Sequence, residues 1–387
     1  MDEPKLSREC EIAVVGGGIA GLVTALNLAR AGREVVVLER GEPWGESSGA
    51  NAGTISILAM PPSEARLCRE TLRLWDGMRR ELGASVGFAA PGGLCVALSE
   101  AEVAALGARA VEQRAVGTEV EIVTGATLER LAPWLGPAVR AAAWSALDGF
   151  SSPLETGRAL IDALRAAGVG ILAGAGVTGI EPATGPRAGF RLATSRGALA
   201  CRTVVIAAGA WSGSLARMLG VEIPIYVDVN MLTVTEPMPP FMDRVVTHVG
   251  GMLSLKQFAN GACLVGGGWQ GRGGFAAGRR DVDYERVVHN LRLAARVAPS
   301  LRGARVARSW AGYEGLAVDV RPLFGRLPGY EAVFIVACAR GGFLLGPVLG
   351  RLMAELVLEG RTSLPVDAYD PARFQPAPAA GADSAHT

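Results

Sequence analysis

A chain of 387 residues is long for a single hydrophobic core, so two domains are expected. Half of the residues are hydrophobic and the formal net charge is +1 without a basic block, which excludes nucleic acid as an expected partner. No apolar run reaches the roughly 18 residues of a membrane span, and the N-terminus has no apolar signal segment. The sequence therefore predicts a cytoplasmic protein and leaves only peripheral membrane contact open.

The cysteines and histidines predict no metal site. The cysteines stand singly, without a CxxC pair, which fits reduced thiols and provides no ligand set for zinc or an iron–sulfur cluster. The three histidines are too few and too scattered for a metal cluster or a Ser-His-Asp triad. The six cysteines are Cys10, Cys68, Cys95, Cys201, Cys263 and Cys338.

Residues 10–40 predict a strand, a glycine turn, a helix and a second strand. The apolar run 12–15 is followed by the turn 16–21, Gly-Gly-Gly-Ile-Ala-Gly, and apolar residues then recur at helical spacing. A second apolar run ends in Glu39, 18 positions after Gly21 and close to the roughly 20 expected of a dinucleotide-binding unit. The pattern favours dinucleotide binding, and the alternative is a glycine-rich turn that binds nothing.

Each part of this spacing has a physical reason. Gly16 permits the sharp turn, Gly18 lets a pyrophosphate approach the backbone, and Gly21 lets the helix pack against the strand. The start of the helix offers unpaired N–H groups and a positive dipole end to phosphates. Glu39 would accept hydrogen bonds from a ribose hydroxyl and would repel a 2′-phosphate.

The next hundred residues predict a loop followed by surface elements. Small and amide residues fill 47–53, as needed where backbone approaches a ligand, although an ordinary polar loop is the alternative. An amphipathic helix is expected over 63–82 and a short strand over 93–98. Ser99 and Glu102 resemble a capping box that opens a surface helix ending near Gln113.

Residues 144–215 return to the pattern of the first segment. Pro153 starts a helix that runs to about residue 167 and leads to strand-like segments around Ile171 and Val177. Residues 189–193 and 198–201 predict paired strands. The buried run 203–209 ends in Gly209, which indicates a further strand end of the dinucleotide-binding domain.

From residue 223 the alternating stretches 227–235, 252–257 and 262–267 predict an antiparallel sheet in a second domain. A helix is expected over 280–298, a return toward the first domain over 309–315, and a tight turn over 319–325. A buried strand at 333–337 precedes Gly341 and Gly342, and Pro347 fits the first turn of the last helix. That helix would present a second positive terminus to a ligand, and the tail from Pro371 is expected to be disordered.

Taken together, these stretches resemble the FAD-dependent glycine oxidase and D-amino-acid oxidase (DAO) family over about residues 10–370. The resemblance rests on 16–21 with Glu39, 47–53, 148–153, 206–212, 310–325 and 341–350. Residues 253–257, 260–261 and 266–269 look most like the flavoprotein β-type subunits of heteromeric opine and D-hydroxyproline dehydrogenases and of hydrogen cyanide synthase.

The resemblance implies an α/β fold of two domains (α+β in its overall arrangement). A Rossmann-like FAD-binding domain would comprise 1–85, 146–215 and 318–370. An antiparallel-sheet substrate domain would comprise 86–145 and 216–317, and 371–387 would be the disordered tail.

The resemblance also implies where FAD lies. Glu39 would lie at the adenosine, the backbone of Val177 at the adenine, and 342–344 by the pyrimidine end of the flavin. The loop 47–53 has no histidine and Cys338 does not fit the position of a covalent link, so non-covalent FAD is expected. The implied cofactor-binding residues are Gly16, Gly18, Ile19, Ala20, Gly21, Glu39, Arg40, Ser47, Ser48, Asn51, Ala52, Gly53, Val177, Ala208, Gly209, Trp211, Gly341, Gly342, Phe343 and Leu344.

One departure from the family concerns the substrate. In glycine oxidase-like enzymes an arginine commonly follows the segment equivalent to 310–313 and binds the substrate carboxylate, but Glu314 stands there. Either the carboxylate clamp has moved or the substrate presents a cation at this point. Arg340, Arg321 and Lys256 are the candidate replacements, with ordinary surface ion pairs as the alternative, and for Glu314 the alternative is a solvated acid at a turn. Lys256, if it faces the flavin, could instead serve oxygen or a neighbouring cofactor.

The expected activity is oxidation of an amino acid or amine, with hydride transfer from the carbon that bears nitrogen to flavin N5. As a β-type subunit the chain would pass electrons to an α-type redox partner, and any FMN or iron–sulfur centre would lie at or in that partner. The alternatives are a self-sufficient oxidase that produces hydrogen peroxide, a non-catalytic electron-relay subunit, and an NAD-dependent dehydrogenase that shares the N-terminal motif.

Overall fold

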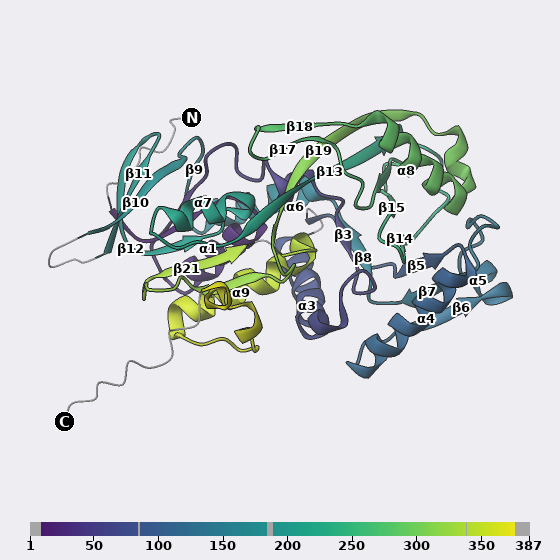
Figure 1. Ribbon diagram of the computed structural model, residues 1–387, viewed down its shortest axis with the longest axis horizontal. Coiled ribbons are helices and arrows are strands. Elements are labelled where there is room, and N and C mark those ends of the chain that lie inside the picture. Colours follow the sequence, from purple (N-terminus) through teal and green to yellow (C-terminus); the bar gives the residue numbers. More distant parts are fainter. Residues whose placement is uncertain (1–8, 84–85, 184–188, 338, 376–387) are drawn as a thin grey trace, which may run out of the picture.

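The computed structural model describes residues 9–83, 86–183, 189–337 and 339–375. It has two lobes, each built on an eight-stranded sheet (Figure 1). The first sheet has the order β10-β11-β12-β1-β2-β9, with β21 beside β12 and β20 beside β21. Its strands are β1 (Glu9–Val15), β2 (Val35–Leu38), β9 (Gly170–Leu172), β10 (Val177–Ala183), β11 (Gly189–Thr194), β12 (Gly197–Ile206), β20 (Leu323–Arg326) and β21 (Val333–Ala337).

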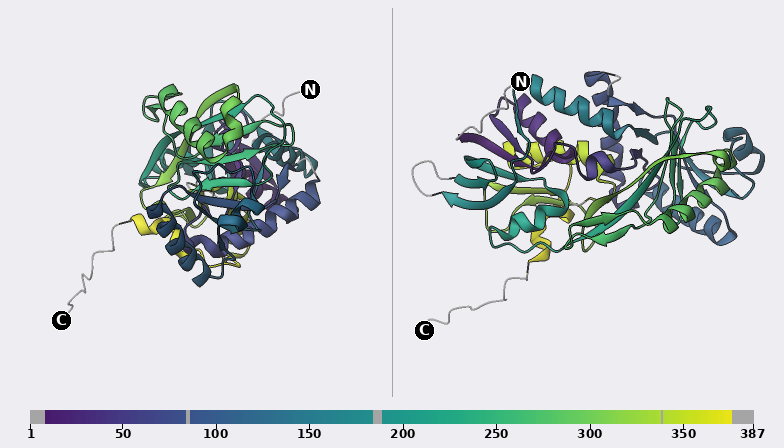
Figure 2. Two further views of the ribbon diagram at one scale, coloured as in Figure 1. Left: turned by 90° about the vertical axis from the view of Figure 1, so that its right-hand side faces the viewer. Right: turned by 90° about the horizontal axis from the view of Figure 1, so that it is seen from above.

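The centre of the first sheet is parallel and buried on both faces. Strands β9, β2, β1, β12 and β21 run parallel, so their carboxyl ends meet at one edge. Side chains alternate along β1: Ile12 and Val14 join one core cluster, and Ala13 and Val15 join the other. Four helices cover the first face and one covers the second (Figure 2). They are α1 (Ile19–Arg30), α3 (Ala65–Leu82), α6 (Pro153–Ala166) and α9 (Gly342–Glu359), and on the opposite face α7 (Ser212–Arg217).

The first glycine turn has the packing that its sequence predicts. Gly16 has φ +119°, and a Cβ there would lie 2.3 Å from the carbonyl oxygen of Ala207. A Cβ on Gly21 would lie 2.1 Å from the carbonyl oxygen of Gly16. Both positions therefore need glycine to bring α1, β1 and β12 together. The strand–turn–helix–strand unit of residues 10–38 is confirmed.

The second sheet has the order β19-β13-β16-β15-β14-β5-β7-β6 and is antiparallel apart from the β14–β5 pair. Helices α5 and α8 cover one face, and α4 covers part of the other. The strands are β5 (Gly93–Ala97), β6 (Glu121–Thr124), β7 (Ala141–Ser145), β13 (Ile225–Thr235), β14 (Val245–His248), β15 (Ser254–Gln257), β16 (Cys263–Gly266) and β19 (Val306–Ala317), and the helices are α4 (Glu100–Ala115), α5 (Gly125–Leu131) and α8 (Tyr284–Val297).

The expected capping box at Ser99 is present with one change of partner. The Ser99 hydroxyl accepts a hydrogen bond from the Glu102 N–H, while Glu102 Oε2 accepts from the N–H of Leu98 at 2.6 Å. The second bond therefore closes on the residue before the N-cap.

Short elements connect the lobes. A small sheet of order β3-β8-β4 lies between them, and a β17–β18 hairpin extends from the second lobe over the first. Every strand of each large sheet falls within the residue ranges expected for its domain, although the domain division itself stays a prediction. The short elements are α2 (Ser47–Ala50), β3 (Thr54–Ile55), η1 (Pro62–Glu64), β4 (Phe88–Ala89), β8 (Gly149–Ser151), η3 (Gly209–Trp211), β17 (Arg272–Gly274), β18 (Arg279–Asp281), η4 (Pro299–Gly303), η5 (Asp367–Tyr369) and η6 (Pro371–Phe374).

Two expectations about the C-terminal part are wrong. The last helix begins at Gly342, one turn before the expected start, because Gly341 adopts φ +69° and caps it, so Pro347 lies inside the helix. Pro347 has no N–H and therefore cannot donate the helical hydrogen bond at its position. On either side of it, Gly346 and Gly350 pack closely against Ile19 and Val23 of α1. The expected disordered tail also starts too early: 371–374 form η6, and 376–387 lie outside the described residues.

Two further segments are more regular than expected. Residues 47–50 form the short helix α2 within the predicted loop, and 309–315 belong to the long strand β19, which pairs with β13 over its whole length. None of the described helices has the length and apolarity that crossing a bilayer requires. Nor do the described residues hold a group of three or more His, Cys, Asp or Glu side chains that could bind a metal ion.

Candidate active site

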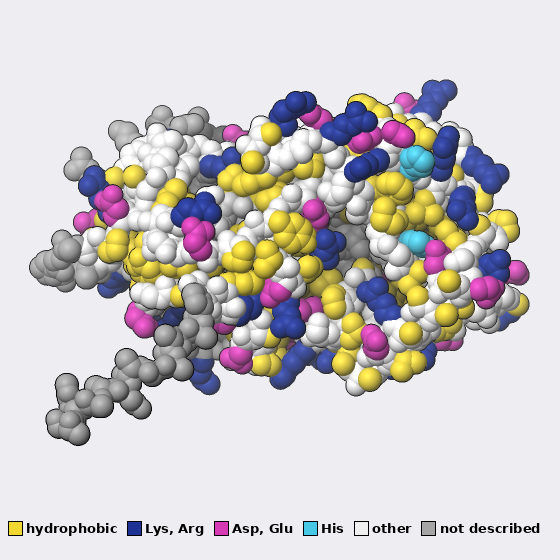
Figure 3. All heavy atoms as spheres, in the orientation of Figure 1, with side chains coloured by type: hydrophobic (Ala, Val, Ile, Leu, Met, Phe, Trp, Pro, Cys, Tyr) yellow, Lys and Arg dark blue, Asp and Glu magenta, His cyan; other side chains and the backbone are white. Residues whose placement is uncertain are grey.

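A cavity of about 590 Å³ is lined by both glycine turns, 16–20 at the start of α1 and 341–344 at the start of α9. Its other walls come from the loop 44–52, from strand ends of the first sheet, and from β13, β14 and β19 of the second sheet. Figure 3 shows a hollow between the two lobes, with Lys or Arg side chains beside it. The two ends of the chain that carry glycine turns therefore meet at one site, as the sequence predicts.

Most of the expected cofactor residues line this cavity. They are Gly16, Gly18, Ile19, Ala20, Glu39, Arg40, Ser47, Ser48, Asn51, Ala52, Val177, Ala208, Gly209, Trp211, Gly341, Gly342, Phe343 and Leu344. Gly21 and Gly53 do not line it. Gly21 packs against Gly16, and Gly53, with φ +66°, would place a Cβ 2.1 Å from the carbonyl oxygen of Ser151. Both glycines therefore allow close backbone packing behind the cavity wall and do not line the cavity themselves.

Glu39 joins two turns beside the cavity through its carboxylate. One carboxylate oxygen accepts a hydrogen bond from the Gly17 N–H and the other from the Gly41 N–H, both at 2.8 Å. The side chain still lines the cavity, and each carboxylate oxygen has a second lone pair. The contact with a ribose hydroxyl stays a prediction.

The loop before α2 is anchored by Trp44, which the sequence did not single out. Trp44 has φ +70°, its N–H donates to the carbonyl of Gly17 at 2.9 Å, and its indole N–H donates to the carbonyl of Pro153 at 2.7 Å. The ring lies against α6, where a Cβ on Gly157 would come within 2.5 Å of it. A side chain therefore fixes a strained backbone beside the first glycine turn.

Helix α2 is tied to both lobes. The Ser48 hydroxyl accepts from the N–H of Ile19 at 3.0 Å, at the start of α1. The Ser47 hydroxyl donates to the carbonyl of Tyr313 at 2.5 Å, and the Trp310 indole N–H donates to the carbonyl of Ala50 at 2.9 Å. Strand β19 of the second lobe therefore positions the part of the loop nearest the first glycine turn.

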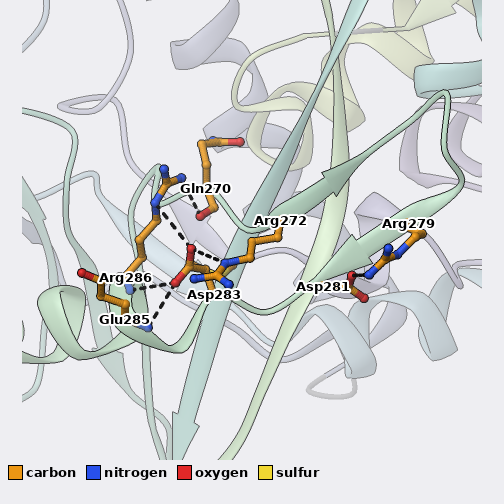
Figure 4. Close-up of polar contacts among 8 residues, drawn as sticks. Gln270, Arg272, Arg279, Asp281, Asp283, Glu285 and Arg286 are labelled. Atoms are coloured by element: carbon orange, nitrogen blue, oxygen red, sulfur yellow. Dashed lines mark hydrogen bonds and ion pairs between the residues drawn. The ribbon is translucent and has the colours of Figure 1, made fainter.

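The β17–β18 hairpin closes over the same loop. Arg280 on β18 forms an ion pair with Glu46, which also pairs with Arg40 at 2.6 Å, and the Arg40 guanidinium lies 3.7 Å from the ring centre of Trp211. Asp283 holds the hairpin to α8 (Figure 4): it caps the helix through the N–H groups of 285 and 286 and pairs with Arg272 at 2.8 Å. The hairpin is thus fixed at its base and reaches Glu46 from there.

Lys256 lies fully buried on β15, with its amine held by three acceptors. It donates to the carbonyl of Ala52 and to the hydroxyl of Thr54, both at 2.6 Å, and to the hydroxyl of Ser254 at 2.9 Å. Burial lowers the pKa of Lys256 to about 7. Lys256 does not itself line the cavity, but all three of its partners do. Any effect on the reaction would therefore pass through these partners.

Glu314 and Arg340 bring opposite charges to the cavity wall. Glu314 Oε2 accepts from the Asn230 amide, whose oxygen accepts from Gln270 Nε2 at 2.5 Å. Arg340 lies 3.7 Å from a carboxylate oxygen of Asp228. Burial raises the pKa of Glu314, an effect that Arg340 opposes and Asp228 increases. Glu314 is therefore a held, partly desolvated carboxyl group and not a solvated acid at a turn.

Comparison with known proteins decides the family. The family described as "DAO: FAD dependent oxidoreductase" matches residues 11–356. The chain belongs to the DAO family of FAD-dependent oxidoreductases.

The similarity to known relatives extends over nearly the whole chain. The chain is 27% identical to sarcosine oxidase subunit beta of Rhizobium meliloti, over 96% of this chain and 90% of that protein. It is also 27% identical to hydrogen cyanide synthase subunit HcnC of Pseudomonas aeruginosa, over 98% and 100%. The crystal structure of L-proline dehydrogenase from P. horikoshii superposes with a TM-score of 0.86 at 27% identity, covering 95% of this chain and 98% of that one.

FAD is the cofactor of this DAO-family chain, and the residues fit it. Neither α1 nor α9 has a side chain on its N-cap residue that accepts from the first turn, since both N-caps are glycine. The two helix starts therefore present backbone N–H groups and positive dipole ends to the cavity, as anionic phosphates and the electron-rich edge of a flavin require. Residues 47–53 provide no histidine for a covalent link, and Cys338 lies outside the described residues, so non-covalent binding stays a prediction.

The structure does not bring Arg321 to the cavity. Its N–H donates to Asp319 at 3.2 Å on the turn before β20, and Asp319 in turn pairs with Arg373 at 2.8 Å. Arg373 of η6 donates hydrogen bonds to this turn, which therefore packs against η6 and not against the cavity. Of the four residues expected to act on the substrate, Glu314 and Arg340 line the site, Lys256 lies behind its wall, and Arg321 lies elsewhere.

Several lining residues were not anticipated. Trp44, Met60, Arg109, Asn230, Thr247 and His248 all line the cavity. Asn230 could have been found as a polar residue two positions after Asp228, on the same face of β13. Arg109 shares the helix face of Glu102, seven residues earlier, but the sequence suggests a surface helix there. Met60 carries no sequence signal, because only the tertiary fold brings it to Gly341.

Proposed function

We propose that this chain oxidises the C–N bond of an amino acid or a secondary amine, as the catalytic flavoprotein subunit of a heteromeric dehydrogenase. When bound, FAD would supply the hydride acceptor, its N5 atom. The observation that carries the proposal is the pairing of Glu314 and Arg340 on one cavity wall beside the α9 glycine turn. A carboxyl group and a guanidinium suit the amine and the carboxylate of one small substrate.

The surrounding residues orient this pair. Asn230 fixes one oxygen of Glu314, and no described residue donates to Oε1, which leaves that atom for a substrate N–H. The raised pKa of Glu314 favours transfer of an amine proton to the carboxyl group, and hydride leaves only a carbon whose nitrogen is un-ionised. Asp228 lies 3.7 Å from the Arg340 guanidinium, so it weakens the attraction of Arg340 for a substrate carboxylate without cancelling it.

The test is anaerobic bleaching of the flavin in the FAD-loaded chain by glycine, sarcosine, proline, hydroxyproline and opines of both configurations. For any substrate that bleaches the flavin, Glu314→Gln should raise the dissociation constant at least about tenfold, because the carboxylate that meets the incoming ammonium group before proton transfer is lost. Glu331→Gln, which removes an exposed carboxylate outside the cavity, is the control and should change nothing. An unaltered dissociation constant in Glu314→Gln would remove Glu314 from the substrate site.

The subunit role has a separate test. Two of the relatives are named as subunits, sarcosine oxidase subunit beta and hydrogen cyanide synthase subunit HcnC, which supports the proposal of a redox partner. After anaerobic reduction, air is admitted and the return of flavin absorbance is followed. Slow reoxidation that an artificial electron acceptor accelerates is expected. Fast reoxidation with stoichiometric hydrogen peroxide would instead identify a self-sufficient oxidase.

A further inference from the structure

The cavity extends along the second sheet far beyond Glu314. Register places Cys95, Thr247 and Ser254 side by side on β5, β14 and β15, and all three line the cavity. Glu314 lies on β19, four strands away from β14 in the sheet order. Because neighbouring strands are about 4.8 Å apart, the backbone path between the two ends is at most roughly 19 Å, and the side chains that extend into the cavity from both ends shorten the gap between their charged groups.

Arg109 supplies an uncompensated positive charge at the β14 end. From α4 its guanidinium lines the cavity and donates to the carbonyl of Met60 at 3.0 Å. No carboxylate among the described residues forms an ion pair with it. Asp148, a buried carboxyl group nearby, does not line the cavity, and its oxygens accept from Ser56 and from the N–H of Ile57.

Unused polar atoms accompany this charge. Thr247 Oγ1 and His248 Nδ1 are buried without a hydrogen-bond partner in the described structure, and both residues line the cavity. The Cys95 thiol faces the Thr247 hydroxyl but is a weak hydrogen-bonding group, so the O–H stays available. His248 Nε2 lies 3.2 Å from a carboxylate oxygen of Glu102, and a neutral ring that donates to this carboxylate keeps Nδ1 as an acceptor, so His248 adds no donor for an anion. Buried polar atoms are nearly always satisfied in native proteins, so this group of residues is expected to meet a ligand.

We propose that Arg109 and Thr247 form an anion-binding subsite for a second acidic group of the substrate. The inference rests on the proposed amine oxidation and adds a substrate class: amino or imino acids with a carboxylate, or another oxyanion, at the end of a chain remote from the reacting carbon. An α-carboxylate would not reach this subsite from Glu314, since amine and carboxylate of a simple amino acid share one carbon. A guanidinium together with a hydroxyl group provides donors that carboxylates and phosphates accept from.

The first experiment uses ligands that cannot react. Adipate and hexanoate have the same chain length and differ by one carboxylate, and their binding to the FAD-loaded chain is measured by calorimetry. We expect adipate to bind at least about tenfold more tightly than hexanoate, and Arg109→Met to abolish the difference. The matched control is Arg114→Met on the same helix, which also loses one bond to a backbone carbonyl, that of Val120, but lies outside the cavity. Arg114→Met should keep the full preference for adipate over hexanoate, and Arg109→Lys should keep part of it.

A phosphonate in place of one adipate carboxylate distinguishes the source of the anion: tighter binding would assign a phosphate-like group, and weaker binding a carboxylate. The absence of an adipate preference, or a preference that survives Arg109→Met, would overturn the subsite. Urea unfolding of both variants shows whether Arg109→Met is folded, and Arg109→Lys serves if it is not.

The second experiment separates this inference from the proposed function. Anaerobic flavin reduction is compared for 2-aminoadipate and norleucine, which share six carbons and differ by the terminal carboxylate. A lower dissociation constant for 2-aminoadipate that Arg109→Met removes supports both proposals. If no amine bleaches the flavin while the adipate preference holds, the proposed oxidation fails alone. If norleucine and 2-aminoadipate reduce the flavin equally well, the subsite fails alone.

Discussion

At the scale of single residues, Lys256 makes the sharpest prediction about pH. Its pKa is lowered to about 7 in the folded chain, against about 10.4 for an unfolded lysine. Between these values the unfolded state binds a proton that the folded state does not, so this residue makes stability rise with pH from about 7 to about 10 and contributes no slope below about 7.

The measurement is urea unfolding of the wild type and of Lys256→Met at pH 7 and pH 9. The free energy of unfolding of the wild type minus that of the variant should increase with pH. Thiol groups and other titrating residues cancel in this difference, and Lys256 is the one lysine among the described residues. A difference that is constant or decreases with pH would show that the three hydrogen bonds to Lys256 keep its pKa near the ordinary value.

At the scale of elements, the loop that borders the first glycine turn depends on how closely helix α6 approaches it. A methyl group at Gly157 would lie within 2.5 Å of the Trp44 ring, and Trp44 in turn holds Gly17 through its backbone N–H. Gly157→Ala should therefore destabilise the chain by about 1–3 kcal/mol and weaken FAD binding, because the ring must move.

The matched control is Gly77→Ala in α3, where a Cβ would meet no atom within 4 Å. It should be neutral or stabilising by up to ~1 kcal/mol, since alanine favours helix. Unfolding midpoints and FAD dissociation constants of both variants test this. Equal FAD affinity in Gly157→Ala and wild type would show that the Trp44 loop positions nothing at the cofactor site.

The elements also show what the sequence could and could not predict. Local spacing sufficed for β1, α1 and β2, because the glycine turn, the apolar period and Glu39 lie within 30 residues. The helix start at Gly342 was missed because Pro347 is a strong local signal, whereas the packing of Gly346 and Gly350 on α1 is visible only in three dimensions.

For the site, residues on glycine turns and strand ends were predictable, since those positions must approach a nucleotide. Arg109 and His248 were not, because their place depends on how α4 and β14 pack against distant loops. Arg321 shows the opposite error: a charged residue near the right sequence position follows a turn that leads away from the cavity.

At the scale of the whole molecule, the two lobes contribute different groups to the cavity. The parallel sheet gathers backbone N–H groups from both ends of the chain at one edge, and the antiparallel sheet supplies the charged wall that faces them. Contacts from Ser47, Glu46 and Ala50 to β18 and β19 join the lobes at the cavity itself. Cofactor binding should therefore stabilise both lobes together.

The central claim is that the turns at 16–21 and 341–344 bind one FAD whose flavin an amine reduces. The most direct measurement is the absorption spectrum of the purified full chain after incubation with FAD and gel filtration, followed by anaerobic addition of the amino acids and amines named above. The account predicts one FAD per chain, released intact on denaturation, and flavin bands that bleach with at least one of these substrates. A colourless chain that retains no FAD would contradict it.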